Sequence, residues 1–227
     1  MIDKVTTIAR AVDSVKTGDT LMIGGFGIQG CALSLLRELA RRPIYELTTI
    51  SEDAGFVFGA IEQAVPQLLE QRQIQKMCLS FLGGNQTAHS MINSSKLELD
   101  LIPQGTLAER IRIAGAGLGG FYTPTGVGTA MEKGKEKKII DGKEYILELP
   151  LHANVAFIKA YRADHMGNAV FKYTAMNFNP LMAMAADITI VEAEEIVENG
   201  MIEPDHVHLP GVFTDYVVLS EGVKYSD

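Results

Sequence analysis

The first segment whose residues could do chemistry is Gly24-Gly25-Phe26-Gly27-Ile28-Gln29-Gly30. It follows an apolar run and precedes an amphipathic stretch, which predicts a loop between a strand and a helix. Glycines there let backbone N–H groups approach an anion at the positive end of the helix. Glu52 and Asp53 close the next predicted strand, as a ribose-binding acid would in a nicotinamide dinucleotide site.

The dinucleotide pattern of Gly25, Gly27 and Gly30 is weak evidence by itself. The acid lies farther along than the usual spacing of about 20 residues. The same pattern recurs from Gly115 to Gly120, where no strand precedes it. No Lys-Ser or Lys-Thr follows the first loop, which excludes a P-loop. A cofactor loop and a tight turn needed only for packing both stay open.

The second segment is Pro103-Gln104-Gly105-Thr106, where a predicted strand ends and a helix opens. Open α/β sheets bind ligands at the carboxyl ends of their strands, and Gln104 would project from that edge. Its amide could donate a hydrogen bond to a carbonyl oxygen that becomes negative during a reaction. The alternative role for Gln104 is to cap the helix.

A third segment, Gly115-Ala116-Gly117 and the glycines that follow it to Gly126, is too rich in glycine for a regular element. Such a loop loses much entropy on ordering, so its backbone should lie against a substrate or another subunit.

The remaining polar residues are weaker candidates. Glu203, Asp205, His206 and His208 could suggest a metal, but two prolines among them favour an exposed loop and we expect no metal. Cys31 fits a small core residue better than a reactive thiol. We expect the charged run Glu192, Glu194 and Glu195 to be solvated.

The elements that must position these residues alternate. Predicted strands lie at 20–23, 47–51, 74–82, 97–102, 155–158 and 188–191, and predicted helices at 5–15, 33–39, 56–70, 89–94, 106–113 and 181–186. Short connections between them imply an α/β fold: an open, largely parallel sheet with helices on both faces. Asp141-Gly142 predicts the turn of an inserted β-hairpin. No linker is apparent, so we expect residues 1–227 to form a single domain.

Composition narrows the class of protein. The 227 residues carry 20 Lys and Arg against 28 Asp and Glu, a net charge of −8, which argues against nucleic acid as a partner. Two cysteines are too few for a disulfide framework and favour the cytoplasm. No stretch predicts a secretory signal or a membrane span.

Several blocks together resemble the alpha subunit of family I CoA-transferases, the acetate/acetoacetate (3-oxoacid) enzymes. The resemblance covers nearly the whole chain in the same order. The matching blocks are Gly24-Gly25-Phe26-Gly27, the run from Pro103 through Gln104 to Arg112, Gly115-Ala116-Gly117, the run from Phe121 to Gly126, and Asn177-Phe178-Asn179-Pro180.

The resemblance implies an enzyme that moves coenzyme A between short-chain carboxylic acids of the acetate, acetoacetate and butyrate class. The covalent glutamyl-CoA thioester would form on a beta subunit in an α2β2 heterotetramer, with acyl-CoA as substrate and no bound cofactor. Gln104 matches the family glutamine near the reacting carbonyl oxygen. The two glycine segments, with Phe26, Ala116, Glu52 and Asp53, would then line the cleft for substrate and CoA.

Two features depart from the family or imitate its motifs. Glu52-Asp53 stands where the 3-oxoacid relatives carry paired asparagines or Asn-Asp. An added carboxylate repels a substrate carboxylate unless it is protonated or paired. The identity of the acyl donor and acceptor therefore stays open. Glu198-Asn199-Gly200 imitates the beta subunit's glutamate motif, but its surroundings match those of the alpha chain, so Glu198 is not expected to be the nucleophile. A nicotinamide-dependent oxidoreductase and a metabolite-sensing module stay as alternatives.

Overall fold

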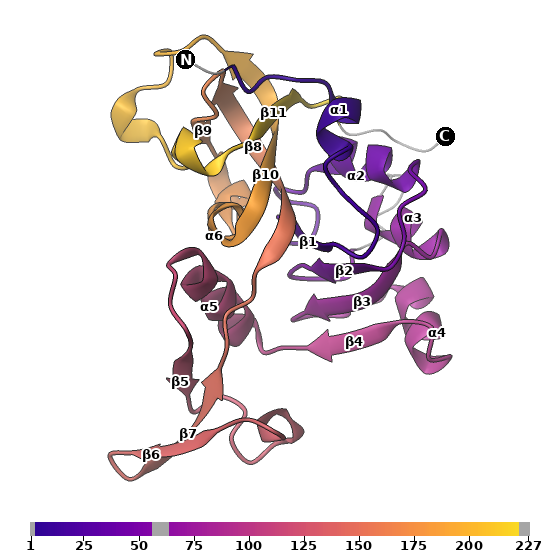
Figure 1. Cartoon of the computed structure of the whole chain (residues 1–227), viewed down its shortest axis with the longest axis vertical. Helices are drawn as coiled ribbons and strands as arrows, with labels where there is room; N and C mark the ends of the chain where they lie inside the picture. Colours follow the sequence, from indigo (N-terminus) through magenta and orange to yellow (C-terminus); the bar gives the residue numbers. More distant parts are fainter. Residues whose placement is uncertain (1–2, 56–63, 223–227) are drawn as a thin grey trace.

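The computed structural model describes residues 3–55 and 64–222 (Figure 1). The strands of its main sheet are β1 (Thr20–Ile23), β2 (Leu47–Ile50), β3 (Ile74–Leu79), β4 (Glu98–Leu101), β8 (Ala153–Asp164), β9 (Ala169–Val170), β10 (Ala186–Val197) and β11 (Tyr216–Leu219). Their order is β11-β10-β8-β1-β2-β3-β4, with β9 paired to β8. The pairs along this order are parallel, and β9 is antiparallel to β8. The expected open, largely parallel sheet is confirmed.

Helices cover both faces of the sheet, as predicted (Figure 1). One face carries α1 (Ile8–Val12), α2 (Leu33–Ala40), α3 (Ala64–Glu70) and α4 (Gln86–Asn93); the other carries α5 (Gln104–Gly115) and α6 (Asn179–Ala185). Alternate side chains of each strand point to opposite faces. In β1, Leu21 and Ile23 therefore join the core under α1–α4, while Met22 joins the core under α5 and α6.

An excursion between α5 and β8 forms a separate three-stranded antiparallel sheet in the order β5-β7-β6, which lies at the bottom of Figure 1. Its strands are β5 (Phe121–Thr123), β6 (Lys137–Ile140) and β7 (Lys143–Glu148). The turn at Asp141-Gly142 has positive φ at both residues, which confirms the inserted hairpin. The expectation of no regular element between 115 and 129 was wrong at β5, because the free edge of β7 supplies its hydrogen bonds.

The ends of several elements differ from the predicted ones. The first helix begins at Ile8, because the Thr7 side chain accepts a hydrogen bond from the Arg10 N–H while Val5 pairs with Val217. Residues 56–63 of the predicted helix 56–70 lie outside the described residues, and α3 covers its end. The sequence did not predict β9 or β11. Short 3-10 helices lie at Ala130–Glu132, Tyr173–Met176, Pro204–His206 and Gly211–Phe213. In the described part of the chain, every helix is too short or too polar to cross a bilayer.

Candidate active site

Polar side chains gather at the edge of the sheet where the parallel strands end. Gly24 follows β1, Glu52 and Asp53 follow β2, Ser80 follows β3, and Gln104 opens α5 after β4. Because the carboxyl ends of neighbouring parallel strands share one edge, residues far apart in sequence meet there.

Asp53 ties the glycine loop to the end of β2. One of its carboxylate oxygens accepts a hydrogen bond of 2.6 Å from the Gly27 N–H, and the other accepts one of 2.6 Å from the Gly55 N–H. Gly27 has a φ of +60°, the left-handed region that glycine enters without strain. Both oxygens of Asp53 therefore already bind backbone N–H groups of this chain.

Glu52 is buried, with 4% of its surface exposed. Its Oε1 accepts a hydrogen bond of 2.9 Å from the Ser80 hydroxyl, while its Oε2 is buried without a partner among the described residues. Burial disfavours the charged form and raises the pKa of Glu52 to about 7, with the neighbouring Asp53 carboxylate adding to the shift and the Ser80 hydroxyl opposing it. Glu52 is thus an acid that holds a proton near neutral pH.

Gln104 is exposed at the first position of α5. The residue before it, Pro103, occupies the cap position, and no side chain caps this helix, so the alternative of a capping role for Gln104 was wrong. Its Nε2 donates a long hydrogen bond of 3.5 Å to Glu52 Oε1. An amide donor therefore stands at the open edge of the sheet, beside a buried carboxyl group.

The glycine loop and the end of β2 enclose a cavity of about 30 Å³, room for about two water molecules. Its lining includes Gly24, Gly25, Gly27, Ile28, Cys31, Ser51, Glu52 and Asp53. Burial raises the pKa of the Cys31 thiol to about 12, with the Glu192 and Asp53 carboxylates adding to the shift, which agrees with its interpretation as an inert core residue. Phe26 stands outside this lining and is 48% exposed.

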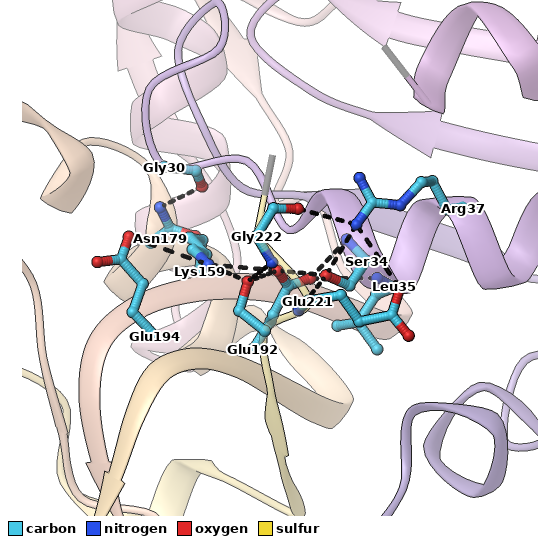
Figure 2. Close-up of polar contacts among 11 residues, drawn as sticks. Gly30, Ser34, Leu35, Arg37, Lys159, Asn179, Glu192, Glu194, Glu221 and Gly222 are labelled. Carbon is cyan, nitrogen blue, oxygen red and sulfur yellow. Dashed lines mark hydrogen bonds and ion pairs between the residues drawn. The ribbon is translucent and has the colours of Figure 1, made fainter. Parts of the chain in front are cut away.

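The start of α2 binds an anion from within the chain (Figure 2). Glu192 of β10 is 1% exposed, so the expectation that it is solvated was wrong; Glu194 and Glu195 are exposed as predicted. The Glu192 carboxylate accepts hydrogen bonds from the N–H groups of Ser34 (2.9 Å) and Leu35 (3.1 Å). Ala32 at the cap position has no side-chain oxygen, and the carboxylate takes its place.

These contacts bear directly on the dinucleotide hypothesis. A pyrophosphate would need the N–H groups of the glycine loop and of the following helix. In this chain Asp53 occupies the Gly27 N–H and Glu192 occupies the Ser34 and Leu35 N–H groups. Both anion-binding elements are filled by carboxylates of the protein itself, which disfavours a nicotinamide cofactor.

The structure places Gly115, Ala116 and Gly117 away from the other candidate site residues of this chain. They lie at the far end of α5, about 17 Å along the helix axis from Gln104. Gly115 has a packing role there, because a Cβ at this position would lie 2.7 Å from Met184 Cβ of α6. Their place in the cleft stays a prediction.

The weaker candidates have structural roles or stand apart. His208 Nδ1 accepts a hydrogen bond from the Phe171 N–H and its ring stacks on Phe171. Residues 3–55 and 64–222 contain no group of three or more ligands arranged to hold a metal. Glu198 is exposed after β10 and does not line the cavity.

The roles of Ser80 and Glu192 were not predicted from the sequence. Ser80 fell inside the predicted strand 74–82, which ends at Leu79 in the structure. For Glu192 a weak signal existed: Ala32 leaves the start of α2 without a capping side chain of its own, which leaves room for an acceptor from elsewhere in the chain.

The fold and this edge define an open α/β protein whose polar side chains gather where the parallel strands end, the place where sheets of this kind bind ligands. Residues 5–220 match the family Coenzyme A transferase. The chain is 46% identical over 210 residues to the A-type chain of a probable succinyl-CoA:3-ketoacid coenzyme A transferase of Bacillus subtilis, covering 92% of this chain and 87% of the relative. It is 41% identical over 224 residues to the alpha chain of the acetate CoA-transferase of Escherichia coli K12, covering 99% of this chain and 100% of the relative.

A solved acyl-CoA transferase from Escherichia coli O157:H7, in a thioester complex with CoA, has the same fold. Its TM-score is 0.85 at 22% identity, over 96% of this chain and 47% of the longer one, so this chain spans about half of that protein. The chain belongs to the coenzyme A transferase family. This confirms the resemblance and the prediction of a transferase, and it does not favour the oxidoreductase or sensor alternatives.

Proposed function

We propose that this chain is the alpha subunit of a CoA-transferase that moves coenzyme A between short-chain carboxylic acids. The observation that carries the proposal is the exposed Gln104 amide at the carboxyl edge, next to one carboxyl group that is buried and one whose two oxygens already accept hydrogen bonds. Glu52 is buried and Asp53 is held by two backbone N–H groups, so neither is free to attack a thioester. The nucleophilic glutamate then comes from a beta subunit.

The chemistry fits the position of Gln104. Attack of a carboxylate on an acyl-CoA puts negative charge on the carbonyl oxygen, and a preorganised N–H donor stabilises that charge. Gln104 opens α5, a helix of 12 residues whose first turn has no side-chain cap. The free N–H groups and positive end of this helix add to the same stabilisation. This chain would therefore hold the developing oxyanion while its partner forms the covalent thioester.

Apolar side chains beside the polar edge support a partner that covers it. Phe26 is 48% exposed and Leu101, at the end of β4, is 51% exposed. The relatives are named as one of two kinds of chain, which implies a second type of subunit in those enzymes. We propose an α2β2 assembly in the cytoplasm, in which the loop from Gly24 to Gly27 forms one wall of the cleft. Because this chain carries a net charge of −8, the beta subunit would supply most contacts to the polyanionic CoA.

The test compares the chain alone with the chain co-expressed with its beta subunit. Transfer of CoA from acetyl-CoA to acetoacetate or butyrate should occur only in the complex. Full activity of this chain alone would reject the proposal, and so would a complex that forms but transfers CoA to none of these acids.

Replacing Gln104 tests its role within that complex. Gln104→Ala should lower kcat by about ten- to a thousandfold, the effect of removing one oxyanion donor. Gln86→Ala is the matched control, because Gln86 is also exposed at the first position of its helix, α4. Equal rates for the two variants would reject Gln104 as the oxyanion donor.

A further inference from the structure

Glu52 is the buried titratable group for which the proposed mechanism has no use. Its carboxyl group lies between the end of β3 and the start of α5, where Oε1 meets the Ser80 hydroxyl at 2.9 Å and the Gln104 amide at 3.5 Å. Oε2 is buried and without a partner in the described part of the chain. An ionised carboxylate needs several hydrogen bonds or a cation when buried, and this one has one good hydrogen bond, a long second one and no cation among the described residues.

Burial and the neighbouring carboxylate favour the neutral form of Glu52, and of the groups that face it the Ser80 hydroxyl favours the charged form. Asp53 on the same loop is a second carboxylate, and the Cys31 thiol, which lines the same cavity, stays protonated. Ser80 from β3 and Gln104 from α5 are polar but uncharged. Among the described residues no cation acts on Glu52, whose pKa lies at about 7.

The protonation state of Glu52 determines which acceptor the Gln104 amide N–H can bind. A carboxylate is a stronger hydrogen-bond acceptor than a carboxylic acid, so an ionised Glu52 draws the Gln104 N–H toward itself. It also places a negative charge beside the carbonyl oxygen that becomes negative during transfer, which raises the energy of the transition state. A neutral Glu52 leaves the N–H available to the substrate and adds no charge.

We infer that Glu52 is a proton-dependent positioning residue that releases the Gln104 amide to the acyl oxygen when neutral and withholds it when ionised. The inference rests on the proposed function and deepens it, because it assigns a regulatory role to a buried residue that the transfer itself does not use. Activity that depends on the neutral form falls as the pH rises through 7. At pH 8.5 about one Glu52 in thirty is still neutral, so kcat should be about thirtyfold below its value at pH 5.5.

The experiment measures kcat and KM of the complex with its beta subunit from pH 5.5 to 8.5, using acetyl-CoA and butyrate. Glu52→Gln keeps the size of the side chain and fixes it in a neutral form, so this variant should be about thirtyfold faster than the parent at pH 8.5. The gain should be in kcat with little change in KM. Glu98→Gln is the control: Glu98 lies on the neighbouring β4, exposed and paired with Lys76, and its variant should keep the parent profile.

Two further variants separate the possible causes. In a Gln104→Ala background, Glu52→Gln should change the pH profile much less, since only the direct effect of the Glu52 charge on the carbonyl oxygen remains. Ser80→Ala removes the hydrogen bond that stabilises the charged form of Glu52, so the decline in kcat should move to higher pH. This second variant tests the inference even if Glu52→Gln does not fold.

The outcomes are distinct. Parallel pH profiles for the parent and Glu52→Gln, or a folded Glu52→Gln that is slow at every pH, would overturn the inference and leave the transferase proposal standing. No CoA transfer by the parent complex at any pH would reject the proposed function itself, and this inference with it.

Discussion

Replacing Glu192 removes the carboxylate that holds the start of α2. Besides the Ser34 and Leu35 N–H groups, Glu192 Oε1 accepts hydrogen bonds from the Ser34 hydroxyl at 3.0 Å, the Ser220 hydroxyl at 2.6 Å and the Lys159 ammonium at 3.2 Å (Figure 2). Glu192→Ala would leave the partly buried Lys159 ammonium without its nearest carboxylate. It would also leave two N–H groups of the helix without an acceptor.

The expected cost follows from these contacts. Breaking a buried ion pair by removing one partner destabilises by about 3–5 kcal/mol. Loss of a helix cap adds about 1 kcal/mol. Lys159 can recover part of this, because Glu194 Oε1 lies 4.0 Å from its Nζ. We therefore expect Glu192→Ala to lower the free energy of unfolding by about 3 kcal/mol.

Urea unfolding of the full chain, followed by circular dichroism, measures this loss. Glu194→Ala is the control: it lies two residues farther along β10, contacts the same lysine and is 56% exposed, so it should cost less than about 1 kcal/mol. In a double-mutant cycle with Lys159→Met, Glu192→Leu should cost much less than it does alone, because no ammonium is left unpaired. Equal losses for Glu192→Ala and Glu194→Ala would refute the reasoning.

Three other predictions concern the same region. Gly30→Ala should lower the free energy of unfolding by about 2–4 kcal/mol, because Gly30 has a φ of +77° and a Cβ there would lie 2.5 Å from the Ala175 carbonyl oxygen. Gly27→Ala is the control: a Cβ at Gly27 meets open space, so this variant should cost about 1 kcal/mol in the same urea assay. Cys31 and Cys78 should react with iodoacetamide at pH 8 far more slowly than glutathione does, because burial raises the pKa of both thiols; labelling of the folded chain at the rate of glutathione would contradict this. The pKa of Glu52 is about 7 in the folded chain, above its ordinary value of 4.5, so the folded chain binds this proton more tightly than the unfolded chain. This contributes to the free energy of unfolding in full below pH 4.5, and the contribution is lost as the pH rises through 7. Thermal unfolding at pH 5 and pH 8 should show that loss for the parent and a smaller one for Glu52→Gln.

The sequence was sufficient to predict six of the eight strands of the main sheet because each of these six carries a local signal, whereas β9 and β11 were not predicted. The apolar run before Gly24 and the leucines of α2 define strand, loop and helix without tertiary information. Parallel strands then require that Glu52, Asp53 and Gln104 meet at one edge, as they do. β5 lacked such a signal, since its hydrogen bonds come from β7 across 20 residues or more of chain.

The contacts of the charged side chains could not be predicted in the same way. Glu192, Glu194 and Glu195 look alike in a sequence, and alternation along β10 alone does not reveal that Glu192 meets a helix 158 residues earlier. Asp53 likewise resembles a ligand-binding acid until its two backbone partners are known. Whether a carboxylate is available to a ligand depends on what the fold already places beside it.

That principle also explains why a glycine loop of dinucleotide type can serve another chemistry here. Asp53 neutralises the loop and Glu192 neutralises the start of α2, so these two features stabilise the fold instead of binding a phosphate. The Asn85 side chain caps the start of α4. Among the helix starts described after β1, β3 and β4, that of α5 has no side-chain acceptor and carries Gln104. The negative charge that a reacting carbonyl develops is thus best accommodated at the end of β4, and the residue that modulates this site is Glu52 on the neighbouring loop.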